Sequence, residues 1–205
     1  MILTINPDNP QPRFIQRIVE CLQQGGIIIY PTDTTYGIGC DIFNRKGLKK
    51  ISQIKQRDNR KPFSFICSDL AEIASYAQVS NFAFKIMKRH LPGPYTFVLE
   101  ASKIVPDSVS TRQKTVGVRI PDNAICQAIV KELGHPLITT SANLSGEETP
   151  QDPQFLQESM GRLVDIVVDG GVSLDDASSV ISLLDNQIEV LRQGSGDTDW
   201  IEQDN

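Results

Sequence analysis

Short apolar runs alternate with amphipathic stretches along most of this chain, and this alternation is the feature that most restricts its fold. In residues 13–24, Phe14, Ile18 and Leu22 recur at four-residue steps before a Gly-Gly pair, which is typical of a helix with a glycine stop. The next run, IIIYP at 27–31, is short and β-branched, as in a buried central strand. Strands that alternate with helices predict an α/β fold, a mixed and mostly buried sheet flanked by helices.

The same periodicities divide the rest of the chain into further elements. Helices are predicted at 13–24, 46–57, 81–90, 123–133 and 153–160, with a short helix that ends at Tyr76 and is capped by Ser68 or Asp69. Strands are predicted at 27–31, 62–67, 95–100, 115–120, 137–140, 164–168, 179–184 and 188–192. The stretch TDTTYGIG (32–39) is rich in hydroxyls and glycine, and is predicted to be a loop at the C-terminal end of the first strand, where open α/β sheets tend to bind ligands. We expect one domain over residues 1–205.

Size and composition exclude several classes of protein. A chain of 205 residues with 40% apolar residues, 22% charged residues and a net charge of −5 is typical of a soluble globular protein. No stretch approaches the roughly 20 apolar residues of a membrane span, and no signal run begins the chain, so a cytoplasmic location is predicted. The pI near 5.1 is unlike that of a dominant nucleic-acid binder, so any RNA contact must come from a local basic patch.

The cysteines and histidines do not form a metal or disulfide pattern. Cys21, Cys40, Cys67 and Cys126 are far apart and never in a CxxC pair, so they are predicted to be small buried hydrophobes. The two histidines are not at metal-ligand spacing.

A dense group of cations lies in KQRDNRKP at 55–62. Lys55, Arg57, Arg60 and Lys61 could simply complement the dipole at the end of the predicted helix, a contribution of about 0.3–1 kcal/mol. The alternative is a binding site for an anion. It is favoured by two arginines at the ends of other predicted strands, Arg119 and Arg192, because guanidinium groups bind carboxylate or phosphate oxygens in paired hydrogen bonds.

A second stretch of short polar groups, TTSANLSG at 139–146, follows an apolar strand. Its hydroxyls and amide could bind phosphate oxygens, or act as neutral ligands of a magnesium ion. They could equally close a turn with their own side chains. The sequence contains no GxxxxGK[ST], GxGxxG or GxSxG motif, which argues against P-loop, Rossmann and α/β-hydrolase chemistry. What remains is a site of Lys, Arg, Ser, Thr and Asn, which suits electrostatic stabilisation of an anion.

Six segments in this order resemble the YrdC-like family, and its YciO-type subgroup in particular. They are YPTDTTYGIGCD (30–41), KQRDNRKP (55–62), PGPYTFVL (92–99), VGVRIP (116–121), TSANLSG (140–146) and VLRQG (190–194). The resemblance covers about residues 10–196, which leaves 197–205 as a tail. It implies a twisted mixed sheet with an open, positively lined cleft.

Members of that family are threonylcarbamoyl-AMP synthases, which combine L-threonine, bicarbonate and ATP and release pyrophosphate for tRNA modification. The resemblance implies that Lys55 and Arg57 are catalytic. It implies ATP binding by Lys55, Arg57, Lys61, Ser141, Asn143, Thr149 and Arg192, with Mg²⁺ at Ser141 and Asn143. It implies threonine binding by Thr32, Thr34, Thr35, Arg119 and Ser178. Partner proteins of the tRNA modification pathway would use the product.

Two segments, INPDNPQPR (5–13) and FSFICSDL (63–70), resemble the YciO-type subgroup, and DASSV (176–180) departs from the commoner Glu-Ser-Thr pattern of the family. Ile66 stands where some synthases carry a histidine for threonine. The alternative function is therefore a YciO-type protein that binds double-stranded RNA or tRNA, with a weak or vestigial synthase site. Binding to several RNA phosphates would weaken steeply with ionic strength, whereas binding of ATP in a formed pocket would be less sensitive to salt.

Overall fold

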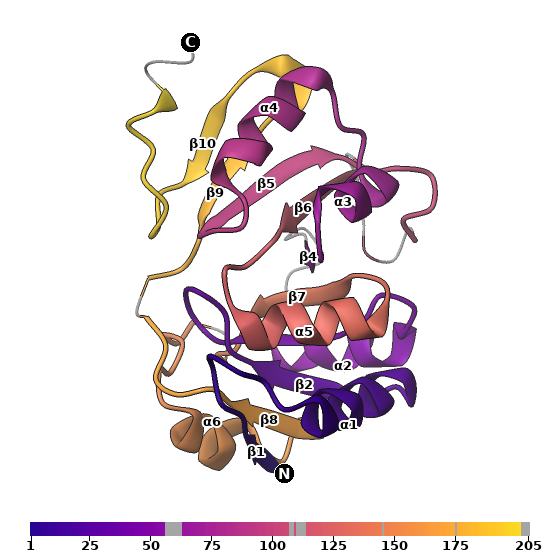
Figure 1. Ribbon diagram of the computed structural model, residues 1–205, viewed down its shortest axis with the longest axis vertical. Coiled ribbons are helices and arrows are strands. Elements are labelled where there is room, and N and C mark those ends of the chain that lie inside the picture. The colour runs from indigo at the N-terminus through magenta and orange to yellow at the C-terminus, as the bar shows by residue number, and fades with distance from the viewer. Residues whose placement is uncertain (56–62, 107–108, 110–113, 145, 175, 202–205) are drawn as a thin grey trace.

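The computed structural model describes residues 1–55, 63–106, 109, 114–144, 146–174 and 176–201. Ten strands form one mixed sheet in the order β1-β8-β2-β3-β7-β4-β6-β5-β9-β10, and helices flank it (Figure 1). The strands are β1 (Ile2–Thr4), β2 (Ile27–Tyr30), β3 (Gly37–Asp41), β4 (Ser64–Ile66), β5 (Tyr95–Glu100), β6 (Thr115–Arg119), β7 (Leu137–Ser141), β8 (Ile166–Asp169), β9 (Ser179–Ser182) and β10 (Glu189–Arg192). The helices are α1 (Pro12–Gln23), α2 (Arg45–Ile54), α3 (Leu70–Tyr76), α4 (Asn81–His90), α5 (Ala124–Leu133), α6 (Pro153–Met160) and the 3₁₀ helix η1 (Leu184–Asn186). The predicted fold class is confirmed.

One face of the sheet carries a continuous apolar row. Strand pairing places side chains from β3, β7, β4, β6, β5 and β9 side by side on this face, because directly opposed residues point the same way. The row consists of Cys40, Ile138, Phe65, Val118, Phe97 and Ile181, each 0% exposed. Buried residues of α2, α3 and α4 pack against it in the larger core. This face therefore holds the fold together and is closed to ligands.

The other face is covered only in part. Helices α1 and α5 pack their buried residues on β1, β8 and β2 and on the ends of β4 and β7. In Figure 1 both helices lie in front of the lower strands, while α4 lies in front of the upper strands. Since α4 belongs to the larger core and α1 and α5 to the smaller one, the twist of the sheet brings opposite faces toward the viewer in its two halves. The middle of the second face is left open.

Most predicted elements are present, and the helix caps are as expected. Asp69 accepts a hydrogen bond from Glu72 N at 2.8 Å, so it, rather than Ser68, caps α3. The predicted 46–57 helix ends earlier, at Ile54, with Lys55 as its C-cap. The predicted 179–184 strand ends at Ser182, because the chain turns through two left-handed residues, Asp185 and Asn186.

The prediction of a loop over 32–39 is wrong at its end, where β3 begins at Gly37. Glycine is depleted in strands, but here two glycines make room for a neighbouring ring. A Cβ on Gly37 would lie 3.0 Å from Tyr30 Cζ, and one on Gly39 would lie 2.5 Å from Ile138 O. Strand β1 was also not predicted. It has three residues and pairs with β8 at the edge of the sheet.

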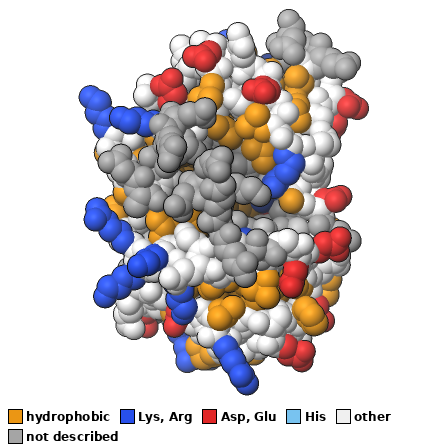
Figure 2. All heavy atoms as spheres, turned by 180° about the vertical axis from the view of Figure 1, so that it is seen from behind, with side chains coloured by type: hydrophobic (Ala, Val, Ile, Leu, Met, Phe, Trp, Pro, Cys, Tyr) orange, Lys and Arg blue, Asp and Glu red, His pale blue; other side chains and the backbone are white. Residues whose placement is uncertain are grey.

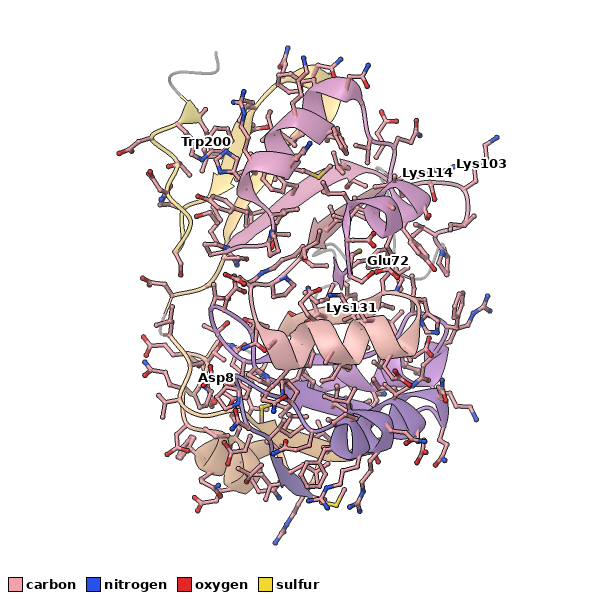
Figure 3. All side chains as sticks on the ribbon, viewed as in Figure 1. Asp8, Glu72, Lys103, Lys114, Lys131 and Trp200 are labelled. Carbon is pink, nitrogen blue, oxygen red and sulfur yellow. The ribbon has the colours of Figure 1, made fainter. Side chains whose placement is uncertain are left out.

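The last described residues, Trp200 and Ile201, pack beside α4. Trp200 stacks on His90 with ring centroids 4.2 Å apart, and its indole nitrogen donates to Asp197 O at 2.8 Å (Figure 3). Ile201 is 9% exposed. A tail was predicted at 197–205; within it, Trp200 packs on His90 of α4 and Ile201 joins the larger core, while 202–205 lie outside the described residues.

Candidate functional site

A cleft of about 600 Å³ occupies the uncovered middle of the sheet. Its floor is a row of small side chains that strand pairing brings to one face. Thr139 of β7 opposes Ser64 of β4, Ser64 opposes Gly117 of β6, and Gly117 opposes Val98 of β5. A polar floor behind the continuous apolar row of the opposite face marks this part of the sheet as a surface suited to a polar ligand.

Lys55 is tied to the end of β7 by a ring of oxygens. Its ammonium group donates to Ser141 O at 2.9 Å, to Asn143 O at 2.8 Å and to Asn143 Oδ1, and lies 3.5 Å from Ser141 Oγ. The Ser141 hydroxyl donates to Asn143 Oδ1 at 2.6 Å. Residues more than 80 positions apart in sequence thus form one cluster, and Ser141 lines the cleft. The oxygens that Ser141 and Asn143 place around the Lys55 ammonium group are all neutral.

Arg119, at the end of β6, enters the cleft from the floor. Its guanidinium donates to Asp33 Oδ1 at 2.5 Å, and the two side chains are 8% and 11% exposed. Among the described residues, buried Arg119 Nε and Asp33 Oδ2 have no hydrogen-bond partner. A buried donor without a partner costs about 1–3 kcal/mol, so this arginine is suited to receive a further acceptor from a ligand.

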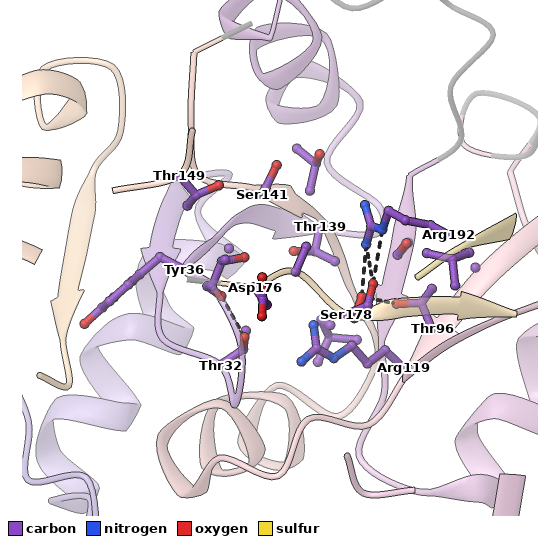
Figure 4. Close-up of a pocket in the computed structure, with 18 of the residues that line it drawn as sticks. Thr32, Tyr36, Thr96, Arg119, Thr139, Ser141, Thr149, Asp176, Ser178 and Arg192 are labelled. Atoms are coloured by element: carbon purple, nitrogen blue, oxygen red, sulfur yellow. Dashed lines mark hydrogen bonds between the residues drawn. The ribbon is translucent and has the colours of Figure 1, made fainter. Parts of the chain in front are cut away.

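Arg192, on β10, also lines the cleft. It donates through Nε and Nη2 to Ser178 O at 3.1 and 2.7 Å, and Ser178 Oγ is 2.9 Å from Thr96 Oγ1 (Figure 4). Burial, and secondly the charge of Arg119, lower the pKa of Arg192. The two guanidinium groups are both positive and repel each other. An anion bound between them would therefore be stabilised by both.

The threonines that follow β2 form a tight turn at the mouth of the cleft. Thr32 Oγ1 donates to Thr35 O at 2.7 Å and accepts from Thr34 N at 3.1 Å. Thr32 and Thr35 line the cleft, whereas Thr34 is 0% exposed and lies behind them. Next to this turn, the Tyr36 hydroxyl donates to Gly171 O at 2.6 Å and accepts from Gly170 N at 3.2 Å, which ties it to the segment after β8.

Most of the predicted site residues that the structure describes therefore surround one cleft. Thr149 also lines it, while Arg57 and Lys61 lie outside the described residues. Sequence analysis named Thr139 only within the polar stretch 139–146, and missed further lining residues: Ser64, Thr96, Glu147, Glu148 and Asp176. The period-two spacing of Thr139 and Ser141 could have indicated Thr139, since both must share a face of β7. The acids could not have been found, because loop residues carry no such period.

Three acids share the lining with the arginines, so the described lining carries both signs of charge. In Figure 4, Asp176 lies between Thr32 and Ser178. Among the residues that the structure describes, no group of three or more His, Cys, Asp or Glu could hold a metal ion. Cys40, Cys67 and Cys126 are buried, as predicted, and Cys21 is partly buried. None of the helices formed by described residues combines the length and hydropathy of a membrane span.

Comparison with known proteins assigns the chain to a family. The Sua5/YciO/YrdC family model, described as telomere recombination, matches residues 20–194. The chain belongs to this family. This Sua5/YciO/YrdC protein is 40% identical to "Uncharacterized protein YciO" of Escherichia coli K12 over 195 residues, which are 94% of this chain and 95% of that protein.

Two other relatives have more informative names. The threonylcarbamoyl-AMP synthase of Vibrio vulnificus is 31% identical and covers 88% of this chain and 98% of its own length. The crystal structure of P. abyssi Sua5 complexed with L-threonine has a TM-score of 0.93 at 26% identity, and covers 99% of this chain and 60% of the Sua5 chain. The crystal structure of E. coli YciO has a TM-score of 0.94 and covers 97% of this chain. The Sua5/YciO/YrdC protein thus shares its fold with both branches.

Proposed function

We propose that this protein forms threonylcarbamoyl-AMP and pyrophosphate from L-threonine, bicarbonate and ATP, in the cytoplasm, for a partner protein that transfers the threonylcarbamoyl group to tRNA. The observation that carries the proposal is the convergence of the Lys55 cluster with Arg119, Ser178 and Arg192 around one cleft. The relatives named threonylcarbamoyl-AMP synthase, and the Sua5 chain solved with L-threonine, support the choice of substrates.

The proposed reaction has two steps. The threonine nitrogen forms a bond to the carbon of bicarbonate, and loss of water leaves a carbamate. A carbamate oxygen then attacks the α-phosphorus of ATP. The bond from the α-phosphorus to the bridging oxygen of the β-phosphate breaks, and pyrophosphate leaves with that electron pair.

The position of each residue in the cleft suggests which part of the substrates it would bind. Arg119 would bind the threonine carboxylate, because its buried Nε has no hydrogen-bond partner among the described residues. Lys55, with Arg57, would stabilise charge that develops on phosphate oxygens, at about 3 kcal/mol for each such donor. Ser141 and Asn143 would hold Lys55 in place, Lys61 and Thr149 would contact the nucleotide, and Arg192 would approach its phosphates. Thr32 and Thr35 would contact threonine from the mouth of the cleft, with Ser178 beside them and Thr34 behind.

The donor set around Lys55 fits a hard cation. It consists of a hydroxyl, an amide oxygen and two carbonyl oxygens, and it already surrounds one cation, the Lys55 ammonium. We propose that Ser141 and Asn143 would help to hold Mg²⁺ when Lys55 turns to the phosphates. The ion would neutralise charge on the leaving pyrophosphate.

The test is pyrophosphate release from ATP and bicarbonate with each amino acid in turn. We expect release that depends on L-threonine, and a loss of about 100-fold or more in Lys55→Ala, because one charge-stabilising donor is removed. Lys50→Ala, on the exposed side of the same helix, is the matched control and should keep wild-type activity. Full activity in Lys55→Ala, or release without any amino acid, would overturn the proposal.

The alternative role, binding of double-stranded RNA or tRNA, has less support from the described residues. Glu147, Glu148 and Asp176 interrupt the lining of the cleft, so it does not form the continuous basic stripe that is typical of a nucleic-acid-binding surface. On the face shown in Figure 2, most Lys and Arg side chains lie toward the left edge, and Asp and Glu side chains lie at the right edge and the top. A steep fall of RNA affinity with salt, with no pyrophosphate release, would favour the alternative.

A further inference from the structure

A buried tyrosine connects the smaller core, under α1 and α5, to the floor of the cleft. Tyr30 of β2 is 0% exposed, and its hydroxyl donates to Thr139 Oγ1 at 2.6 Å. Strand β3 lies between β2 and β7, so the ring must cross it. Gly37 and Gly39 leave the space for this crossing, since a Cβ at Gly39 would lie 3.2 Å from Tyr30 Cε1. The Gly-Ile-Gly sequence of β3 thus allows a side chain from one strand to reach the second strand along.

In this hydrogen bond the Tyr30 hydroxyl is the donor and Thr139 Oγ1 is the acceptor. Desolvation raises the pKa of the Tyr30 hydroxyl, so the phenol keeps the proton that it donates. Among the described residues, Thr139 Oγ1 has no other hydrogen-bond partner, so its own proton remains available to an acceptor in the cleft.

The Thr139 hydroxyl lies at the centre of the predicted site residues. Thr139 and Ser141 point to one face of β7 and are two residues apart, a separation of about 7 Å along a strand. Figure 4 shows Thr139 between Ser141 on one side and Ser178 and Arg119 on the other. The hydroxyl thus lies between the Lys55 cluster and the pair of arginines, where the nucleotide and the amino acid would meet.

We propose that Thr139 is a binding residue of this cleft, that its hydroxyl donates to an anionic oxygen of the bound substrate, and that Tyr30 is the positioning residue that orients it. This inference rests on the proposed function and extends it to two residues not assigned above. The acceptor is a carboxylate, carbamate or phosphate oxygen, groups that share the same hydrogen-bond chemistry. Kinetic measurements separate them.

The experiment compares wild type with Thr139→Val, Thr139→Ser, Tyr30→Phe and the double variant Tyr30→Phe/Thr139→Val in amino-acid-dependent pyrophosphate release. Thr139→Val keeps the shape and removes the donor, so kcat/KM should fall about 10- to 100-fold, as for a hydrogen bond to a charged group. Thr139→Ser should restore most of it. Tyr30→Phe should give a smaller loss, and the double variant should be no worse than Thr139→Val, because Tyr30 acts through Thr139.

The kinetic constants locate the acceptor. A higher KM for threonine indicates its carboxylate, a higher KM for ATP indicates a phosphate oxygen, and a loss in kcat alone indicates the carbamate oxygen in the transition state. Thermal unfolding identifies any variant that is poorly folded, and Thr139→Ala is then used in place of the valine variant.

Three results would overturn the inference, and they are distinguishable. Wild-type kcat/KM in Thr139→Val shows that Thr139 does not contact substrate. Losses that add in the double variant show that Tyr30 acts only on the fold. If wild type releases no pyrophosphate with any amino acid, the proposed function fails and this inference fails with it, whereas an active wild type with an equally active Thr139→Val sinks the inference alone.

Discussion

The charged side chains of the cleft could be predicted from the sequence where they end strands, but not where they lie in turns. Arg119 and Arg192 end strands, so their arrival at one edge followed from the apolar runs before them. The partner of Arg119 did not follow, because Asp33 lies in a turn whose conformation depends on hydrogen bonds among its threonines. Thr34 was predicted to contact threonine from its motif alone, and its full burial could not be read from a motif.

The ion pair between Arg119 and Asp33 yields a prediction at this scale. Asp33→Asn keeps the size of the side chain but leaves a mostly buried guanidinium without its carboxylate, so we expect the free energy of unfolding to fall by about 3 kcal/mol. Urea denaturation measures the change. Asp122→Asn, at an exposed position, is the control and should change stability by less than about 0.5 kcal/mol. Equal stability of the two variants would show that the pair contributes nothing.

At the scale of elements, sequence periodicity predicted the helices and the longer strands, and failed where packing overrides propensity. Strand β3 contains two glycines in five residues and still pairs on both sides, with β2 and with β7. Those glycines are required by the Tyr30 ring and by a backbone carbonyl, neither of which lies nearby in the sequence. Strand β1 is too short to show a period, and only its pairing with β8 defines it.

The two glycines of β3 should differ in their tolerance of alanine. A Cβ at Gly39 would lie 2.5 Å from the carbonyl oxygen of Ile138, a backbone atom of the paired strand that cannot turn aside. A Cβ at Gly37 would lie 3.0 Å from the Thr139 hydroxyl and from Tyr30, which are side chains. We expect Gly39→Ala to lower the free energy of unfolding by about 1–3 kcal/mol and more than Gly37→Ala does. Thermal or urea denaturation of both variants tests this order, and the reverse order would contradict it.

At the scale of the whole molecule, the sequence could not predict the order of the strands. β4 inserts between β7 and β6, and β9 returns beside β5 after the chain leaves β8 at the far side of the sheet. This order brings Ser64, Thr139 and Arg119, from three distant parts of the chain, to one floor. The connection from β8 to β9 makes hydrogen bonds to distant segments, among them Tyr36 Oη to Gly171 O at 2.6 Å and Ser195 N to Ala177 O at 2.9 Å. These contacts depend on the finished sheet.

Buried thiols and phenols make the stability of the whole protein sensitive to alkaline pH. Burial raises the pKa of Cys40 from 9.0 to about 12 and that of Tyr36 from 10.0 to about 12, and also raises the pKa values of Cys67 and Cys126. Above pH 9 the unfolded chain loses these protons while the folded chain retains them, so the unfolded state is favoured.

The contribution of these groups is therefore complete below pH 9 and is lost as pH rises toward 12. We expect the urea midpoint to be insensitive to these groups between pH 7 and 8.5 and to fall steeply from pH 9 to 11, as unfolding releases bound protons. Cys40→Ala removes one of the groups, so its midpoint should fall less steeply over that range, whatever its value at pH 8. Parallel curves for the variant and wild type would mean that Cys40 is not sealed from water. The apolar row that includes Cys40 would then not be sealed either.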